Sequence, residues 1–197
     1  RSNPEALTEN FMRKVFTRLL NGLREVHAHK LLHLDIKPSN IYLRNDRTPL
    51  LIDFGAARQT LARDTPMLKP MFTPGFASPE HHARRERLGP WSDIYSVGAS
   101  MYACLAACIP PSAEARGEND NLAPAAERWH GRYSAQLLET IDWCLRLDPL
   151  QRPQSVFALQ KALTAKVAGS HASTTGASGK DAFGQAVGEL RRAPRAE

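Results

Sequence analysis

The chain has 197 residues, of which 42% are hydrophobic and 23% are charged, a composition typical of one globular domain with a substantial core. Its formal charge is +6, but the basic residues are scattered without interleaved aromatics, so no nucleic-acid partner is expected. The longest apolar run, residues 99–109, is too short for a membrane segment, no signal peptide is recognisable, and three cysteines form no disulfide framework, so we expect a cytoplasmic protein.

Residues 4–30 predict a long amphipathic helix. Its apolar residues follow one another at spacings of four, four, four and three, which makes one stripe: Phe11, Val15, Leu19, Leu23 and Val26. Thr8 is the expected N-cap, although Pro4 also allows an earlier start.

The next stretch, His33-Leu34-Asp35-Ile36-Lys37-Pro38-Ser39-Asn40, brings a carboxylate, an amine and a carboxamide together, and Asp53-Phe54-Gly55 follows it. Asp35 can accept a proton from a hydroxyl, and Lys37 can neutralise charge on a transferring phosphoryl group. Asn40 and Asp53 offer the hard oxygen ligands that Mg²⁺ prefers. This inventory suits phosphoryl transfer, in which positioning and charge stabilisation account for most of the catalysis.

Two short apolar runs, residues 41–43 and 50–52, separate these groups, and turn-forming residues lie between the runs. This pattern predicts a β-hairpin. Because Asn40 enters the hairpin and Asp53 leaves it, both side chains are expected at one edge, where two ligands could share one magnesium ion.

Residues 56–72 have no clean period and contain prolines, which predicts a long loop, and loops of this length are usually functional. A helix is then expected to open at Trp91-Ser92-Asp93, with Ser92 as its N-cap. Apolar residues cover almost all faces of this helix, so it should be buried. Residues 109–132 are expected to form an exposed irregular insertion that could contribute to substrate docking.

Two further helices are predicted, one over residues 136–147 and a last one capped by Ser155. Beyond about residue 167 the composition becomes rich in Gly, Ser, Thr and Ala, as in flexible linkers. We therefore divide the chain into a domain over residues 1–165 and a flexible linker and tail over residues 166–197.

The motifs resemble those of the protein kinase family. Asp35 matches the catalytic Asp, Asn40 the loop Asn, and Asp53-Phe54-Gly55 the metal-binding triplet. Thr73-Pro74-Gly75-Phe76-Ala77-Ser78-Pro79-Glu80 resembles the end of the activation segment, with Phe76 in place of Tyr and Ser78 in place of Ala. Asp148-Pro149-Leu150-Gln151-Arg152-Pro153 resembles a turn of the same family.

The resemblance implies roles for individual residues. Asp35, Lys37 and Thr73 would be catalytic, with Thr73 lying against the other two. Lys37, Asn40 and Asp53 would bind the nucleotide, and Asn40 and Asp53 the metal. Three residues would give structural support: Asp93 by holding the backbone of the catalytic loop, and Glu80 and Arg152 by forming an ion pair.

The implied fold is a mainly α, protein-kinase-like C-terminal lobe with a small β-hairpin. Counterparts of the N-terminal lobe, namely the Gly-rich loop, the strand lysine and its glutamate partner, are absent from this sequence. The chain also begins at Arg1 without a methionine, so we expect a fragment or a trimmed chain. Without that lobe ATP would meet an open, wet surface, and we expect the isolated chain to have little kinase activity.

The implied function is that of a Ser/Thr protein kinase of bacterial type, which uses ATP and Mg²⁺ and phosphorylates a protein substrate. Lys37 favours Ser/Thr specificity. Leu34 stands where most of the family has Arg, so dependence on phosphorylation of Thr60 or Thr65 is not expected. Two alternatives stay open: a kinase-like binding or scaffold module without catalysis, and a small-molecule kinase of the aminoglycoside-phosphotransferase type. The sequence does not indicate the oligomeric state.

Overall fold

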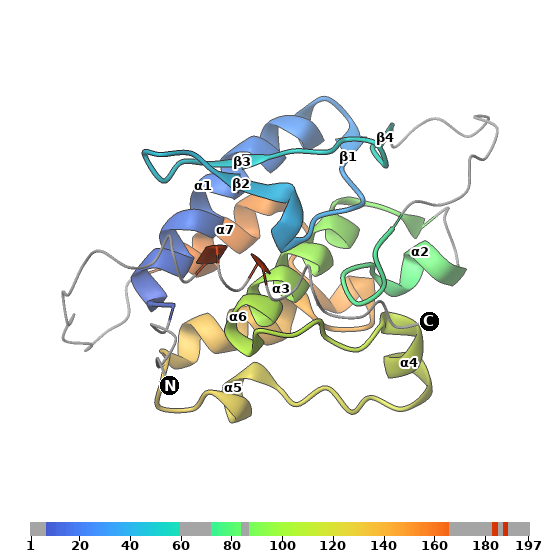
Figure 1. The fold of residues 1–197 in the computed structure, drawn as a ribbon. Helices are drawn as coiled ribbons and strands as arrows, with labels where there is room; N and C mark the ends of the chain where they lie inside the picture. The colour runs from blue at the N-terminus through green and yellow to red at the C-terminus, as the bar shows by residue number, and fades with distance from the viewer. Residues whose placement is uncertain (1–6, 60–71, 84–86, 166–182, 185–186, 189–197) are drawn as a thin grey trace.

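The computed structural model of the chain describes residues 7–59, 72–83, 87–165, 183–184 and 187–188. Helices dominate the fold (Figure 1): α1 (Glu9–Ala28), α2 (Pro79–Ala83), α3 (Pro90–Ala106), α4 (Ala113–Glu118), α5 (Ala125–Arg128), α6 (Ala135–Cys144) and α7 (Val156–Thr164), with the 3-10 helices η1 (Pro38–Asn40) and η3 (Pro149–Gln151). The strands are short: β1 (Leu31–Leu32), β2 (Ile41–Leu43), β3 (Pro49–Leu51) and β4 (Arg58–Gln59). The predicted fold class, a mainly helical lobe with a small hairpin, is confirmed.

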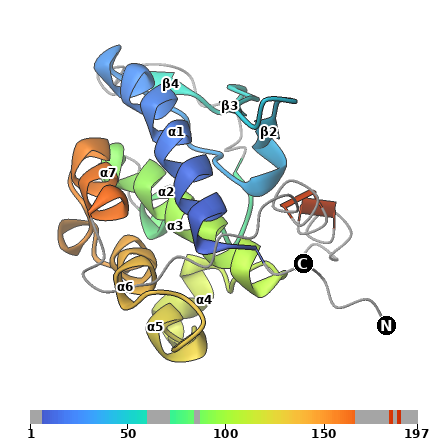
Figure 2. The ribbon, with the colours of Figure 1, turned by 90° about the vertical axis from the view of Figure 1, so that its left-hand side faces the viewer.

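Helix α1 supports the loop over residues 33–40, which contains Asp35, Lys37 and Asn40. The Thr8 side chain accepts a hydrogen bond from the Phe11 N–H at 3.3 Å, so Thr8 is the N-cap and the helix begins at Glu9, later than the predicted residue 4. Its buried face packs against α7 on one side and against the β2–β3 hairpin on the other (Figure 2). Because this face is buried, α1 has a fixed orientation, and it fixes where the loop that follows the helix begins.

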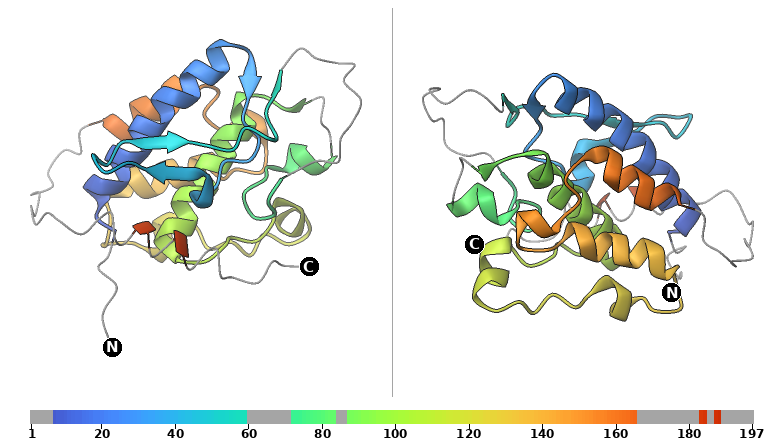
Figure 3. Two further views of the ribbon diagram at one scale, coloured as in Figure 1. Left: turned by 45° about the horizontal axis from the view of Figure 1, so that its top comes forward. Right: turned by 180° about the vertical axis from the view of Figure 1, so that it is seen from behind.

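Two antiparallel strand pairs connect the loop over residues 33–40 with the segment that contains Asp53. In the predicted hairpin Ile41 pairs with Leu51 and Leu43 with Pro49, and the Ile52 N–H extends the ladder to the Asn40 carbonyl at 3.0 Å. Figure 3 shows the hairpin lying across α1. The second ladder, β1 with β4, joins the strand before the loop to the strand after Asp53. It was not predicted, because strands of two residues have no readable period.

Helix α3 runs through the centre of the core and is buried along most of its length, as predicted. It begins at Pro90, however, so the prediction that Ser92 is its N-cap is wrong. Proline is preorganised for the first helical position, which lets the helix start earlier. Gly98 lies on its face toward α6, and a Cβ there would collide with Cys144, so only glycine allows this close approach.

The prediction of an exposed irregular insertion over residues 109–132 is wrong in part, because α4 and α5 lie within it. The Arg116 side chain is buried and donates to the Tyr95 hydroxyl and the Leu145 carbonyl, both at 3.0 Å. The Asp142 carboxylate accepts the first two N–H groups of α5, from Ala125 at 2.6 Å and from Ala126 at 2.9 Å. This segment is held by polar side chains, which leave no periodic apolar pattern in the sequence. The two short helices could therefore not be predicted from periodicity.

The division at residue 165 stays a prediction, since most of the tail lies outside the described residues. Of the tail residues that are described, Phe183 is buried against Phe11, with ring centroids 6.2 Å apart, and Val187 packs against the same core. In the part of the chain that the structure describes, no helix is both long enough and apolar enough to cross a bilayer.

Candidate active site

The carboxylate of Asp35 is the centre of a compact polar cluster. Thr73 Oγ1 donates to one carboxylate oxygen at 2.9 Å, and Lys37 Nζ donates to the other at 2.7 Å. Lys37 Nζ also donates to Thr73 Oγ1 at 2.6 Å, which closes a ring of three side chains. Asn40 Nδ2 donates to the Asp35 backbone carbonyl at 2.9 Å and to its carboxylate at 3.2 Å. The structure thus gathers three of the predicted residues, Lys37, Asn40 and Thr73, around the carboxylate of a fourth, Asp35.

This cluster remains open to a reactant. The Asp35 side chain is 11% exposed and that of Lys37 is 22% exposed. A carboxylate can accept about four hydrogen bonds, and the described residues give Asp35 three, so one lone pair remains for a hydroxyl. The ammonium of Lys37 likewise uses two of about three donors here, which leaves one for an anion.

Buried Asp93 fixes the backbone that carries the cluster. Its two carboxylate oxygens accept the N–H groups of His33 at 2.9 Å and Leu34 at 2.8 Å. Leu34 adopts a left-handed conformation with φ of 65°, which costs a non-glycine residue about 1–2 kcal/mol. His27 Nε2 lies 2.8 Å from the same carboxylate. The contact between His27 and Asp93 was not predicted, because it joins two residues, on different helices, that lie 66 positions apart in the sequence.

His33 links the loop to the strand that precedes Asp53. Its Nε2 lies 3.2 Å from the Ile52 carbonyl, and its Nδ1 accepts the Asp35 N–H at 3.3 Å. A carbonyl can only accept, so the proton is on Nε2 and the ring is neutral. Burial lowers the pKa of His33 below its ordinary value of 6.5, and this desolvation outweighs the opposing attraction of the Asp93 carboxylate.

This lowered pKa makes stability depend on pH. Below about pH 6.5 the unfolded chain binds a proton at His33 that the folded chain does not bind, so protonation favours unfolding. The stabilisation by neutral His33 is therefore complete above pH 6.5 and is lost as the pH falls toward the lowered pKa. We expect the free energy of unfolding to fall less between pH 7.5 and 5.5 in His33→Gln than in the unchanged chain. Urea titrations at both pH values measure this, with exposed His130→Gln as control, and equal losses in all three proteins would contradict it.

The two residues predicted to bind magnesium lie at the same end of the hairpin backbone. Asn40 and Ile52 are joined by the last ladder hydrogen bond, and Asp53 follows directly. Asp53 is exposed and adopts a left-handed conformation, with φ of 64°, while its Oδ1 accepts the Gly55 N–H at 3.2 Å. The Asn40 amide nitrogen is turned toward Asp35, which leaves its oxygen for another partner. One carboxylate and one amide oxygen fit Mg²⁺, which is usually completed by substrate phosphates and water.

The segment that supplies Thr73 is shaped by a tight turn. The Phe76 N–H donates to the Thr73 carbonyl at 3.1 Å. Gly75 has φ of 86°, and a Cβ there would lie 2.5 Å from Ile109 and 2.6 Å from the Pro110 carbonyl oxygen, so glycine is required. The preceding loop, including Thr60 and Thr65, lies outside the described residues.

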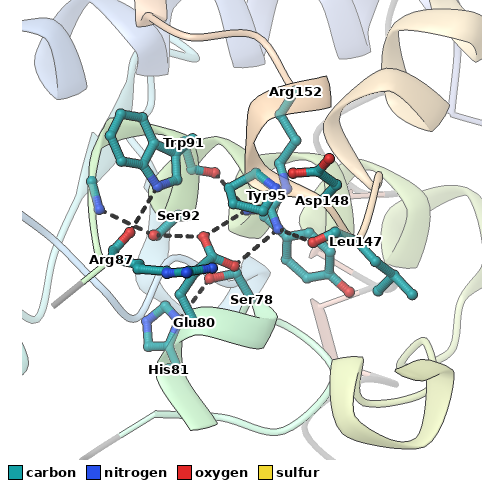
Figure 4. Close-up of polar contacts among 12 residues, drawn as sticks. Ser78, Glu80, His81, Arg87, Trp91, Ser92, Tyr95, Leu147, Asp148 and Arg152 are labelled. Carbon is teal, nitrogen blue, oxygen red and sulfur yellow. Dashed lines mark hydrogen bonds and ion pairs between the residues drawn. The ribbon is translucent and has the colours of Figure 1, made fainter. Parts of the chain in front are cut away.

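Glu80 and Arg152 form a buried bidentate ion pair with both N···O distances at 2.9 Å (Figure 4). The Arg152 side chain is 0% exposed and that of Glu80 is 4% exposed. Arg152 also donates to three backbone carbonyls: Arg146 at 2.6 Å, Leu147 at 2.8 Å and Trp91 at 3.1 Å. All five guanidinium N–H donors are therefore used. The pair ties α2, just after Thr73, to the start of α3 and to the turn before α7.

Comparison with known proteins adds independent information. Residues 2–164 match the family model described as "Protein kinase domain". The chain is 34% identical over 167 residues to serine/threonine-protein kinase Nek2 of Homo sapiens, covering 81% of the chain and 37% of Nek2. It is 32% identical over 157 residues to serine/threonine-protein kinase PknA of Nostoc sp., covering 74% of the chain and 26% of PknA.

A solved structure titled "PpkA-294 apo form" is similar in both fold and sequence. The TM-score is 0.69 and the identity 33%, with 82% of this chain and 57% of that chain covered. The chain thus spans about a quarter of PknA, somewhat more than a third of Nek2 and somewhat more than half of this solved chain.

Proposed function

Since this chain belongs to the protein kinase family, we propose that it is the C-terminal lobe of a serine/threonine protein kinase that transfers the γ-phosphoryl group of ATP to protein hydroxyls. The observation that carries the proposal is the Asp35 carboxylate, held by Thr73, Lys37 and Asn40 with one accepting position left over.

In this proposal each residue of the site has its own role in the reaction. Asp35 orients the substrate hydroxyl and accepts its proton as the oxygen attacks the γ-phosphorus. Lys37, beside Asp35, compensates the negative charge on the phosphoryl group during transfer. Thr73 forms hydrogen bonds with both side chains and so fixes the distance between the Asp35 carboxylate and the Lys37 ammonium. Asn40 and Asp53 would hold Mg²⁺, which when bound neutralises charge on the β- and γ-phosphate oxygens.

A second lobe over this face is part of the proposal. Four apolar side chains on the hairpin and just after it are exposed: Tyr42 at 56%, Leu50 at 37%, Ile52 at 42% and Phe54 at 45%. Apolar groups beside a polar cluster support a site that is closed by another part of a protein. Closure would exclude water and strengthen the charge interactions of Asp35 and Lys37.

The proposal is tested with the two-lobed enzyme that it requires, given Mg²⁺, ATP and a panel of Ser, Thr and Tyr peptides and aminoglycosides. We expect transfer to Ser and Thr peptides, no transfer to matched Ala peptides, and little turnover by the isolated chain. Transfer to aminoglycosides alone would contradict the proposal in favour of a small-molecule kinase. Absence of transfer to every acceptor would instead indicate a binding or scaffold module.

A further inference from the structure

The peptide group between Leu34 and Asp35 is held at both of its polar ends by imidazole rings. Its N–H, which belongs to Asp35, donates to His33 Nδ1 at 3.3 Å. Its carbonyl oxygen, which belongs to Leu34, lies 3.2 Å from Nε2 of His81. Rotation of this peptide would change the direction of the Asp35 side chain, so its two partners control where the carboxylate points.

His81 connects this peptide to the other side of the site. The residue is buried, and because the Leu34 carbonyl can only accept, the proton must be on His81 Nε2. The other ring nitrogen, Nδ1, lies 2.9 Å from the hydroxyl oxygen of buried Ser78, within hydrogen-bond distance. Phe72 contacts the same ring in an edge-to-face arrangement at 5.8 Å. Phe72 and Ser78 flank Thr73, the residue that bonds to Asp35.

We propose that His81 is a positioning residue that locks the catalytic loop to the segment carrying Thr73. The proposal rests on the proposed function, since it concerns the same Asp35 carboxylate. Asp93 and His81 hold the two ends of one strained residue, Leu34: Asp93 receives its N–H at 2.8 Å and His81 donates to its carbonyl. Ser78 contributes by holding the orientation of the ring through its contact with Nδ1. This lock is built from side chains of the chain itself and needs no phosphorylated residue.

The first test uses the full 197-residue chain and measures amide hydrogen exchange at Leu34 and Asp35. His81→Leu removes both side-chain hydrogen bonds, and we expect exchange at these two amides to rise about tenfold more than at amides of the α1 core. His81→Gln keeps a donor at the position of Nε2 and should restore most of the protection. Exposed His130→Leu is the matched control. The ¹⁵N shifts of His81 should show a protonated Nε2.

An equal rise in exchange at all amides would mean that His81 only stabilises the fold, and would overturn the proposal. Equal exchange in His81→Leu and His81→Gln would overturn it as well. If His81→Leu does not fold, Ser78→Ala serves instead, and we expect a smaller rise confined to the same amides. None of these readouts needs nucleotide or activity, so failure of the proposed function leaves them intact.

The second test uses the two-lobed enzyme. We expect His81→Leu to lower kcat about tenfold, with the KM for ATP nearly unchanged, and His81→Gln to recover most of kcat. A change in KM alone, or no rescue by His81→Gln, would overturn the positioning role while leaving Asp35 as the proposed base.

Discussion

Replacing Asp35 with asparagine in the proposed two-lobed enzyme should lower kcat by about 10²- to 10⁴-fold, the range found when a general base is removed. An amide cannot take up the hydroxyl proton, and it offers only one accepting oxygen where the carboxylate now accepts from Thr73, Lys37 and Asn40. The amide would also leave Lys37 without its negative partner at 2.7 Å.

The affinity for Mg²⁺ and ATP should change little in the same variant, because Asn40 and Asp53 are the proposed metal ligands. Steady-state kcat and an equilibrium nucleotide titration separate the two effects. Asp46→Asn, which changes an exposed aspartate in the hairpin turn, is the matched control. A kcat within a few-fold of the unchanged enzyme would remove Asp35 from the role of base.

Replacing Arg152 with methionine should lower the free energy of unfolding of the chain by about 3–5 kcal/mol, as expected when one partner of a buried ion pair is removed. The change leaves Glu80 charged and almost inaccessible to water, and it also removes donors from the carbonyls of Arg146, Leu147 and Trp91. Urea unfolding followed by circular dichroism measures the loss.

The ion pair itself is isolated by a double-mutant cycle with Glu80→Met. Because the two side chains share two hydrogen bonds of 2.9 Å, we expect the double variant to lose less stability than the sum of the two single variants. Arg18→Met, at an exposed position of α1, should stay within about 0.5 kcal/mol of the unchanged chain. Additive losses, or a loss below 1 kcal/mol for Arg152→Met, would show that the pair is not a major support of the fold.

Local patterns predicted the parts of the fold that depend on local physics. The stripe on α1 follows from side-chain periodicity, and the Thr8 cap follows from the backbone N–H groups of the first turn, which have no partner within the helix. The hairpin follows from two apolar runs around a turn, and its closure explains why Asn40 and Asp53 lie near each other. In each case the residues that decide the structure lie within a few positions of one another.

Contacts between distant segments were not readable from spacing. The approach of Thr73 to Asp35 and the pairing of Glu80 with Arg152 were expected only because the motifs resemble a known family. His27, His81 and Arg116 form long-range hydrogen bonds that no local pattern announces. The start of α3 was misplaced because Ser92 looks like a cap in sequence, whereas its hydroxyl accepts the Gly89 N–H from inside the helix and donates to Glu80.

The central claim is that this chain holds a preformed half of a nucleotide site, and Mg²⁺-dependent ATP binding by the chain tests it most directly. We predict that the melting temperature rises with ATP concentration, because a ligand that binds only the folded chain stabilises it. The added free energy of unfolding should be about 2.7 kcal/mol when the ATP concentration is 100 times Kd. The rise should need Mg²⁺ and vanish in Asp53→Ala, while Asp46→Ala keeps it. A folded chain that shows no shift, or an equal shift in Asp53→Ala, would contradict the claim.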